Sequence, residues 1–145
     1  MSDGAPRIVW VTGQEQYRAA LALREQVFCG EQGVPPDEEM DGLDEQARHV
    51  VAIDDGRVVG TLRLLVRGEV AKIGRVAVEP RWRRRGIGQA MMDLGVQGAR
   101  EAGCARAILA SQTYATELYE KAGFIVDSDV FYEAGLPHVW MVLAL

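Results

Sequence analysis

The hydrophobic positions of this chain follow two different spacings, and each spacing predicts its own kind of element. Runs rich in β-branched residues predict about seven strands, at 7–11, 49–53, 58–65, 71–78, 105–110, 124–126 and 139–143. Apolar or small residues at helical spacing predict helices at 15–27, 88–102 and 113–122. Gly103 and Gly123 directly follow two of these helices and are suited to end them. The loop from 30 to 48 leaves room for a short additional helix.

The turns between these elements predict how the strands are connected. Asp55-Gly56 supplies the positive φ angles of a tight hairpin, and Gly68-Glu69 marks a second reversal, so the second to fourth strands form an antiparallel meander. A Gly135-Leu136-Pro137 turn is expected before the last strand. From 71 to 126 the order strand, helix, strand, helix implies a parallel crossover, with ligands bound at the carboxyl ends of its strands. The expected fold class is therefore α/β (α+β), with a mixed central sheet and flanking helices.

Composition narrows the class of protein. The chain has 145 residues, of which 48% are hydrophobic and 26% charged, so we expect a single domain over 1–145 with a packed core. The net charge of −5 argues against nucleic acid as a partner. No segment has membrane-spanning length, and the run 8–11 is too short for a signal peptide, so we expect a cytoplasmic protein. Cys29 and Cys104 lack metal-ligand spacing, and no metal is expected.

The most informative segment is Arg81-Trp82-Arg83-Arg84-Arg85-Gly86-Ile87-Gly88, which joins the strand 71–78 to the helix 88–102. Unpaired N–H groups at a helix start favour an anion, and glycine lets a phosphate approach the backbone. The arginines would add charge-assisted hydrogen bonds to a diphosphate. The alternative is a basic surface loop that is only solvated.

Acidic residues are concentrated elsewhere, in the segment 37–45, which contains six carboxylates. A local negative potential of this kind would attract a cationic amine. The alternative interpretation is a solvated acidic loop.

Several motifs together resemble the GCN5-related N-acetyltransferase (GNAT) family. The run 83–88 fits its Arg/Gln-x-x-Gly-x-Gly/Ala signature, and the segments 23–28, 119–124 and 135–138 resemble the small stand-alone bacterial ElaA-like or YjcF-like members. The resemblance implies the GNAT fold, acetyl-CoA as co-substrate, and transfer of its acetyl group to a primary amine of a small molecule or peptide.

The resemblance also implies roles for individual residues. Tyr119 occupies the position of the tyrosine that relatives use to protonate the departing thiolate. The backbone of the strand before the signature would hold the pantetheine arm, and the loop and helix start would hold the diphosphate. The expected cofactor-binding residues are Val76, Ala77, Val78, Arg83, Arg84, Arg85, Gly86, Ile87, Gly88 and Gln89.

The general base is less well defined by the sequence. Many relatives carry a glutamate on the strand before the signature, where this chain has Ile73-Gly74-Arg75. Glu31 is the first candidate and His138 the second, and a water relay is equally compatible with the sequence. Arg75, Gln112 and His138 are expected to line the acceptor pocket. His49 is expected to serve structure rather than catalysis.

Two other classes of function fit part of this pattern. The first is a noncatalytic acyl-CoA-binding sensor on the same fold, against which the presence of Tyr119 argues. The second is a nucleic-acid module that uses Trp82 among the arginines as a stacking platform, against which the acidic balance argues. The oligomeric state, including a homodimer, is left open.

Overall fold

The computed structural model describes residues 4–145 and contains the expected alternation of elements. In chain order they are β1 (Arg7–Trp10), α1 (Gln14–Arg24), the π-helical segment η1 (Glu25–Glu31), α2 (Pro36–Glu39), the 3-10 turn η2 (Asp44–Gln46), β2 (Arg48–Asp54), β3 (Arg57–Arg67), β4 (Val70–Val78), the 3-10 turn η3 (Pro80–Trp82), α3 (Ile87–Glu101), β5 (Arg106–Gln112), α4 (Thr116–Lys121), β6 (Ile125–Val126), β7 (Phe131–Glu133) and β8 (Leu136–Ala144).

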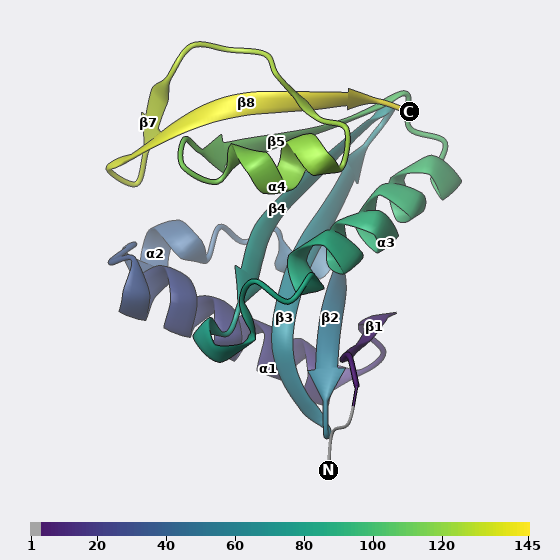
Figure 1. The fold of residues 1–145 in the computed structure, drawn as a ribbon, viewed down its shortest axis with the longest axis vertical. Coiled ribbons are helices and arrows are strands. Elements are labelled where there is room, and N and C mark those ends of the chain that lie inside the picture. Colours follow the sequence, from purple (N-terminus) through teal and green to yellow (C-terminus); the bar gives the residue numbers. More distant parts are fainter. Residues whose placement is uncertain (1–3) are drawn as a thin grey trace.

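All strands belong to one mixed sheet with the order β1-β2-β3-β4-β5-β8-β6, and β7 pairs with β8 (Figure 1). The antiparallel meander of β2, β3 and β4 is confirmed, as is the parallel crossover from β4 to β5. The sheet has eight strands because the short β7 is added to the seven expected. β8 lies between β5 and β6 and is antiparallel to both, so β6 does not extend the sheet directly from β5.

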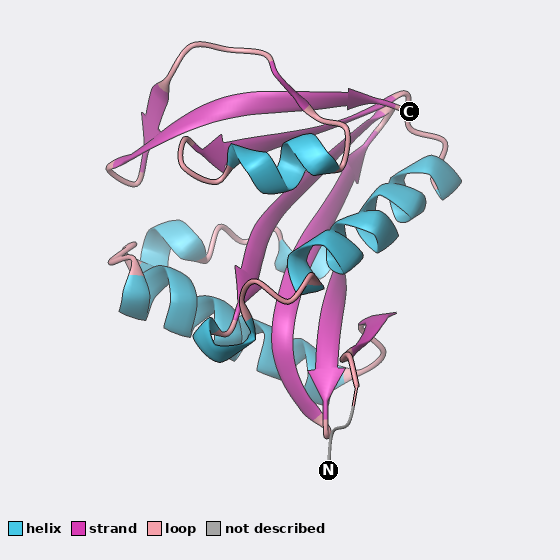
Figure 2. Ribbon diagram, in the orientation of Figure 1, coloured by secondary structure: helices cyan, strands magenta, loops and turns pink. Residues whose placement is uncertain are grey.

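Helices cover both faces of the sheet, as Figure 2 shows. On β2, Val50 and Ala52 pack into the cluster that contains the buried face of α3, whereas Val51 and Ile53 pack with α1. This alternation follows from the two-residue period of a strand, and it explains why β2 is apolar at successive positions. Within the described residues, no helix is long and apolar enough to cross a membrane.

The turns and helix ends differ from expectation at three places. The last hairpin turns at Ala134 and Gly135, whose φ angles are +52° and +76°, so Leu136 and Pro137 belong to β8 rather than to the turn. Proline is tolerated there because Pro137 lies just beyond the last residue of β8 that pairs with β5.

The first and last helices are also shorter than the apolar spacing predicts. α1 ends at Arg24, and the chain continues as η1, where the Gln32 amide donates to the Val27 carbonyl at 3.1 Å. α4 begins only at Thr116, because the Ala115 amide closes a turn onto the Gln112 carbonyl at 2.9 Å. Gln32, which follows η1, and Gln112, which precedes α4, both line the cavity described below.

Gly98 and Gly95 on α3 provide a matched test of this packing. A Cβ added at Gly98 would lie 2.6 Å from a ring carbon of Trp10, which cannot easily yield because Arg48 covers its ring at 3.8 Å. At Gly95 the nearest atom would be 3.4 Å away, an ordinary contact. We expect Gly98→Ala to lower the free energy of unfolding by about 1–3 kcal/mol, and Gly95→Ala to raise it by up to about 1 kcal/mol because alanine favours helix. Urea unfolding measures both, and a stabilised Gly98→Ala protein would contradict the packing.

Candidate active site

A cavity of about 760 Å³ lies between β4 and β5. Residues 72–78 of β4 form one wall, and Leu109, Ala110 and Gln112 of β5 belong to the opposite side. η1, the following loop, α4 and the β7–β8 hairpin complete its lining. The volume falls in the range of small-molecule sites, and the position agrees with the ligand site expected at the carboxyl ends of parallel strands.

The cavity exists because β4 and β5 diverge, as the ribbon in Figure 1 shows. The two strands pair only at Val70–Arg106, Ala71–Ala107 and Lys72–Ile108. Beyond these pairs β4 carries a bulge, in which Arg75 and Val76 oppose the single residue Leu62 of β3. Arg75 has a φ of +53°, and a bulge of this kind bends the strand that contains it. The sequence pattern does not predict the bulge, although a glycine inside a strand, here Gly74, often marks one.

The end of β4 presents backbone groups to the cavity. The Glu79 amide donates to the Val59 carbonyl of β3 at 2.8 Å. Because backbone directions alternate along a strand, the N–H and C=O of Val78 point away from β3 and toward the cavity. The Nε of Arg83 donates to that Val78 carbonyl at 2.9 Å, which supports this orientation. An extended ligand could therefore pair with β4 as an added strand.

The turn before α3 forms a potential anion site at the end of this wall. Gly86 caps the helix with a φ of +81°, and the first helical hydrogen bond runs from the Ala90 amide to the Gly86 carbonyl at 3.0 Å. The amides of residues 86–89 thus have no partner within the helix. At Gly88 an added Cβ would meet the Leu118 side chain at 3.3 Å, so this glycine also lets α4 approach α3.

The arginines of this turn are not equally available to an anion. Arg81 contacts Glu79 at 3.2 Å, and Arg83 forms a bidentate pair with Glu31 at 2.6 and 2.8 Å. The Arg85 guanidinium lies 4.9 Å from the centroid of the Trp82 ring, which is partly buried against the core. Trp82 is therefore covered rather than presented as a stacking platform. Among the described residues, Arg84 and Arg85 have no carboxylate in salt-bridge contact.

Tyr119 on α4 lines the same cavity as Val78. Its ring packs against the main core cluster, and burial raises the pKa of its hydroxyl to about 12. The side chain is therefore protonated at neutral pH and can donate a hydrogen bond.

His138 of β8 is buried, and it also faces the cavity. Its Nδ1 lies 2.8 Å from the Leu136 carbonyl. A carbonyl can only accept, so Nδ1 carries the hydrogen, and in the neutral ring Nε2 carries a lone pair. This arrangement suits a proton acceptor.

Glu31 has surroundings that suit a base less well. The hydrogen bonds from Arg83 lower the pKa of Glu31, and they outweigh the opposing effect of burial. A carboxylate with a lowered pKa holds a proton poorly near neutral pH.

Other polar residues of the cavity are already hydrogen bonded. The Gln112 side chain donates to Gln32 at 2.9 Å and joins the end of β5 to the residue after η1. Arg75 donates to Glu39 at 2.8 Å and to Asp41 at 3.3 Å. Both residues line the cavity, but the guanidinium of Arg75 is engaged by these carboxylates.

The six carboxylates of the acidic segment 37–45 fall into two groups, one paired with arginines and one exposed to solvent. Three of its carboxylates form a cluster with three arginines, and the cluster is mostly buried. Its members are Arg24, Arg63, Arg75, Glu39, Asp41 and Asp44. Asp37, Glu38 and Glu45 remain exposed.

The expected site residues therefore fall into two groups. Those that line the cavity are Val76, Ala77, Val78, Arg83, Tyr119, Arg75, Gln112 and His138. Those that do not line it lie in η1 or in the turn and start of α3, where the Ile87 side chain is part of the buried core; they are Glu31, Arg84, Arg85, Gly86, Ile87, Gly88 and Gln89. The Oε1 atom of Gln89 is buried with no hydrogen-bond partner among the described residues.

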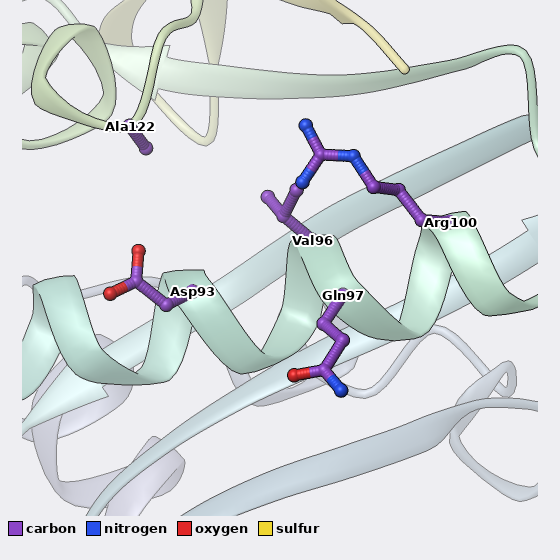
Figure 3. A pocket seen from close by; sticks show the side chains of 5 residues that line it. All are labelled: Asp93, Val96, Gln97, Arg100 and Ala122. Atoms are coloured by element: carbon purple, nitrogen blue, oxygen red, sulfur yellow. The ribbon is translucent and has the colours of Figure 1, made fainter.

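His49 and a second depression on the surface do not belong to the cavity between β4 and β5. His49 is buried, with its Nε2 at 2.9 Å from the Asp44 carbonyl and its ring edge against Tyr17. The described residues contain no group of three or more side chains that could hold a metal ion. A second, open depression of about 360 Å³ lies over α3 (Figure 3), lined by Asp93, Val96, Gln97, Arg100 and Ala122. It contains none of the expected site residues.

Comparison with known proteins agrees with this geometry. Residues 14–145 match the family described as Acetyltransferase (GNAT) domain. The chain is 34% identical over 137 residues to the Bacillus subtilis protein named uncharacterized N-acetyltransferase YjcF, covering 94% of this chain and 98% of that protein. The crystal structure of Escherichia coli ElaA is 28% identical, with a TM-score of 0.82 over 94% of this chain and 99% of that one. An acyl-CoA N-acyltransferase from Pseudomonas aeruginosa is 29% identical, with a TM-score of 0.84 over 95% and 99%.

Asp44→Asn tests the buried cluster that supports the cavity wall. Burial raises the pKa of Asp44, but contacts with Arg24 and Arg63 outweigh it and the net pKa is lowered. We expect this variant to lose about 3–5 kcal/mol of unfolding free energy at pH 7, because two buried arginines lose a carboxylate partner.

The pH dependence of this loss follows from the direction of the shift. A carboxylate with a lowered folded pKa stabilises the protein above its unfolded pKa of about 3.9 and loses this effect as pH falls toward the folded pKa. The difference between the wild type and Asp44→Asn should therefore shrink below about pH 4. Exposed Asp37, in the same segment, provides the control substitution Asp37→Asn. A loss below about 1 kcal/mol at pH 7 would refute a stabilising role for the cluster.

Proposed function

Because this chain belongs to the GNAT family of acetyltransferases, we propose that it transfers the acetyl group of acetyl-CoA directly to the primary amine of an acceptor molecule. The observation that carries this proposal is the cavity between the diverging strands β4 and β5. It combines the backbone N–H of Val78, which points away from β3, a phenol at Tyr119 and an adjacent helix start suited to an anion.

The donor is proposed to occupy the side of the cavity formed by β4 and the start of α3. The amides of residues 86–89 and the side chains of Arg84 and Arg85 would bind its diphosphate. The pantetheine arm would extend along Val76, Ala77 and Val78 and pair with their backbone. The P. aeruginosa relative that carries the name acyl-CoA N-acyltransferase supports an acyl-CoA donor.

In the proposed reaction, His138 accepts one proton from the acceptor ammonium. The free amine then attacks the thioester carbonyl carbon, so that a C–N bond forms and the carbonyl oxygen becomes negatively charged. The N–H of Val78 stabilises this oxygen, an interaction typically worth about 2.7–4 kcal/mol. The C–S bond then breaks, the sulfur takes a proton from Tyr119, and the second amine proton returns to Tyr119 through solvent.

The raised pKa of Tyr119 bears directly on this last step. The raised pKa keeps the Tyr119 hydroxyl protonated before substrate binds, but it also makes Tyr119 a weaker acid. A thiolate that forms in the same partly buried cavity is desolvated as well, and its pKa rises for the same reason. Desolvation thus raises the pKa of the proton donor and of the proton acceptor in the same direction, and proton transfer can accompany cleavage of the C–S bond.

Gly86→Asp tests the donor site. Coenzyme A at about one hundred times its dissociation constant should stabilise the wild type by about 2.7 kcal/mol, which raises Tm by roughly 5–10 °C for a domain of this size. Aspartate at position 86 places a carboxylate at the proposed diphosphate site, so this shift should disappear. Gly103→Asp is the matched control, because Gly103 has a φ of +79° against +81° at Gly86 and both lie in open surroundings. Unchanged coenzyme A affinity in folded Gly86→Asp would exclude this site.

Tyr119→Phe tests the proposed acid and the activity itself. Thiol release from acetyl-CoA is measured with a panel of primary amines, and wild-type protein that binds coenzyme A but releases no thiol above background would be a sensor rather than an enzyme.

With an active amine, we expect Tyr119→Phe to lower turnover by about 10²–10⁴-fold with little change in acetyl-CoA affinity, because protonation of the leaving group matters mainly in the transition state. A loss below about fivefold, with chemistry rate-limiting, would remove Tyr119 from the mechanism.

A further inference from the structure

The imidazole of His138 is held in one orientation by its neighbours. The Leu136 carbonyl fixes Nδ1, and the Phe131 ring stacks on the imidazole with a centroid distance of 5.8 Å and an interplanar angle of 27°. Phe131 stacks in turn on Trp140 at 5.5 Å. With Nδ1 and one ring face fixed, Nε2 is the atom left to contact a ligand.

Among the described residues, the carboxylate within 4 Å of Nε2 belongs to Glu133, on the other strand of the hairpin. Its Oε2 lies 3.9 Å from Nε2, which is too long for a hydrogen bond. A nitrogen atom located about 2.8–3.0 Å from each of these atoms fits between them, so one ammonium group could donate to both. The tight turn at Ala134 and Gly135 sets this spacing, because it places Glu133 opposite Leu136 and Phe131 opposite His138.

Glu133 differs from the other carboxylates that line the cavity. Glu39 and Asp41 are held by arginines of the buried cluster, and Glu38 has no contact with His138 in the described residues. Glu133 is 55% exposed, and among the described residues its only charged contact is the imidazole. It is therefore available to a cationic ligand beside the proposed base.

We propose that Glu133 and His138 together form the binding site for the acceptor's ammonium group, with Glu133 as the residue that binds and orients it. The ammonium donates one N–H to Glu133 Oε2 and one to His138 Nε2. The proton moves to His138 along the hydrogen bond to Nε2. The amine nitrogen, which then becomes the nucleophile, remains bound to Glu133 through the other hydrogen bond. This inference rests on the proposed function and adds an acceptor-binding residue to it.

Binding of simple amines to the intact protein tests the site without any need for turnover. The probe is n-butylamine hydrochloride, and the readout is the imidazole ¹⁵N resonances, which come from only two histidines, His49 and His138. We expect a saturable shift at His138 and none at His49. Glu133→Gln should weaken this binding about tenfold, the lower end of the range for a charge-assisted hydrogen bond, because Glu133 is partly exposed. Glu133→Asp, which retains the charge, should restore part of it.

Three controls separate this site from general charge attraction. Glu69→Gln removes the same charge from an exposed turn between β3 and β4 and should bind n-butylamine as the wild type does. n-Butanol, which lacks the charge, should cause no shift. N,N-Dimethylbutylamine keeps the charge but has one N–H, cannot donate to both atoms, and should bind more weakly than n-butylamine.

The kinetic readout distinguishes a binding role from a structural one. With an amine that the wild type acetylates, Glu133→Gln should raise the KM for that amine about tenfold with a smaller change in kcat and unchanged coenzyme A affinity. Absence of a saturable His138 shift, or equal binding by Glu133→Gln and the wild type, would overturn the proposal. Coenzyme A binding and thiol release are measured separately, so this failure would leave the proposed function intact.

Discussion

Six charged side chains hold β4 in the bent form that makes room for a ligand. Arg75 has a left-handed backbone conformation inside a strand, and such conformations cost of order 1–3 kcal/mol unless the surroundings enforce them. Here the surroundings are Glu39 and Asp41, which are in turn fixed by Arg24 and Arg63. Three positive and three negative charges balance one another, so the cluster can be buried. The bulge that it supports turns the end of β4 away from β5.

The position of each chemical group follows from this divergence. The freed edge of β4 presents the Val78 backbone, and the chain leaves that strand directly into the turn that caps α3. On the opposite side, β5 pairs with β8, so His138 reaches the same cavity from the sheet's second half. Tyr119 comes from the helix that follows β5. The groups proposed to face the donor and the acceptor thus lie on β4 and β8, which are separated by β5 in the sheet.

The sequence predicts the regular strands, helices and their order better than it predicts the irregular features of the backbone. Spacing, Asp55-Gly56 and the glycines after helices identify the meander and the crossover, and the Arg83–Gly88 signature locates the helix start. The bulge, the π-helical segment and the position of the last turn depend on tertiary contacts that no local pattern contains. The same limit applies to charges: nothing in the acidic segment distinguishes Asp44, which is buried among arginines, from exposed Asp37. Glu31 and Arg83 are 52 residues apart, so their pairing is equally hidden in the sequence.

The π-helical segment η1 has a consequence for how this chain can change in length. A π-helical turn contains about one residue more than an α-helical turn. Arg24 at one end is fixed in the buried cluster, and Gln32 just beyond the other is hydrogen bonded to β5. Deleting one residue between them would return the turn to α-helical spacing, and the residues beyond it would not undergo the rotation of about 100° that a deletion within a regular α-helix causes. The additional residue is therefore absorbed locally by the wider turn, and we expect a one-residue deletion in η1 to disturb the rest of the fold less than a one-residue deletion in α1.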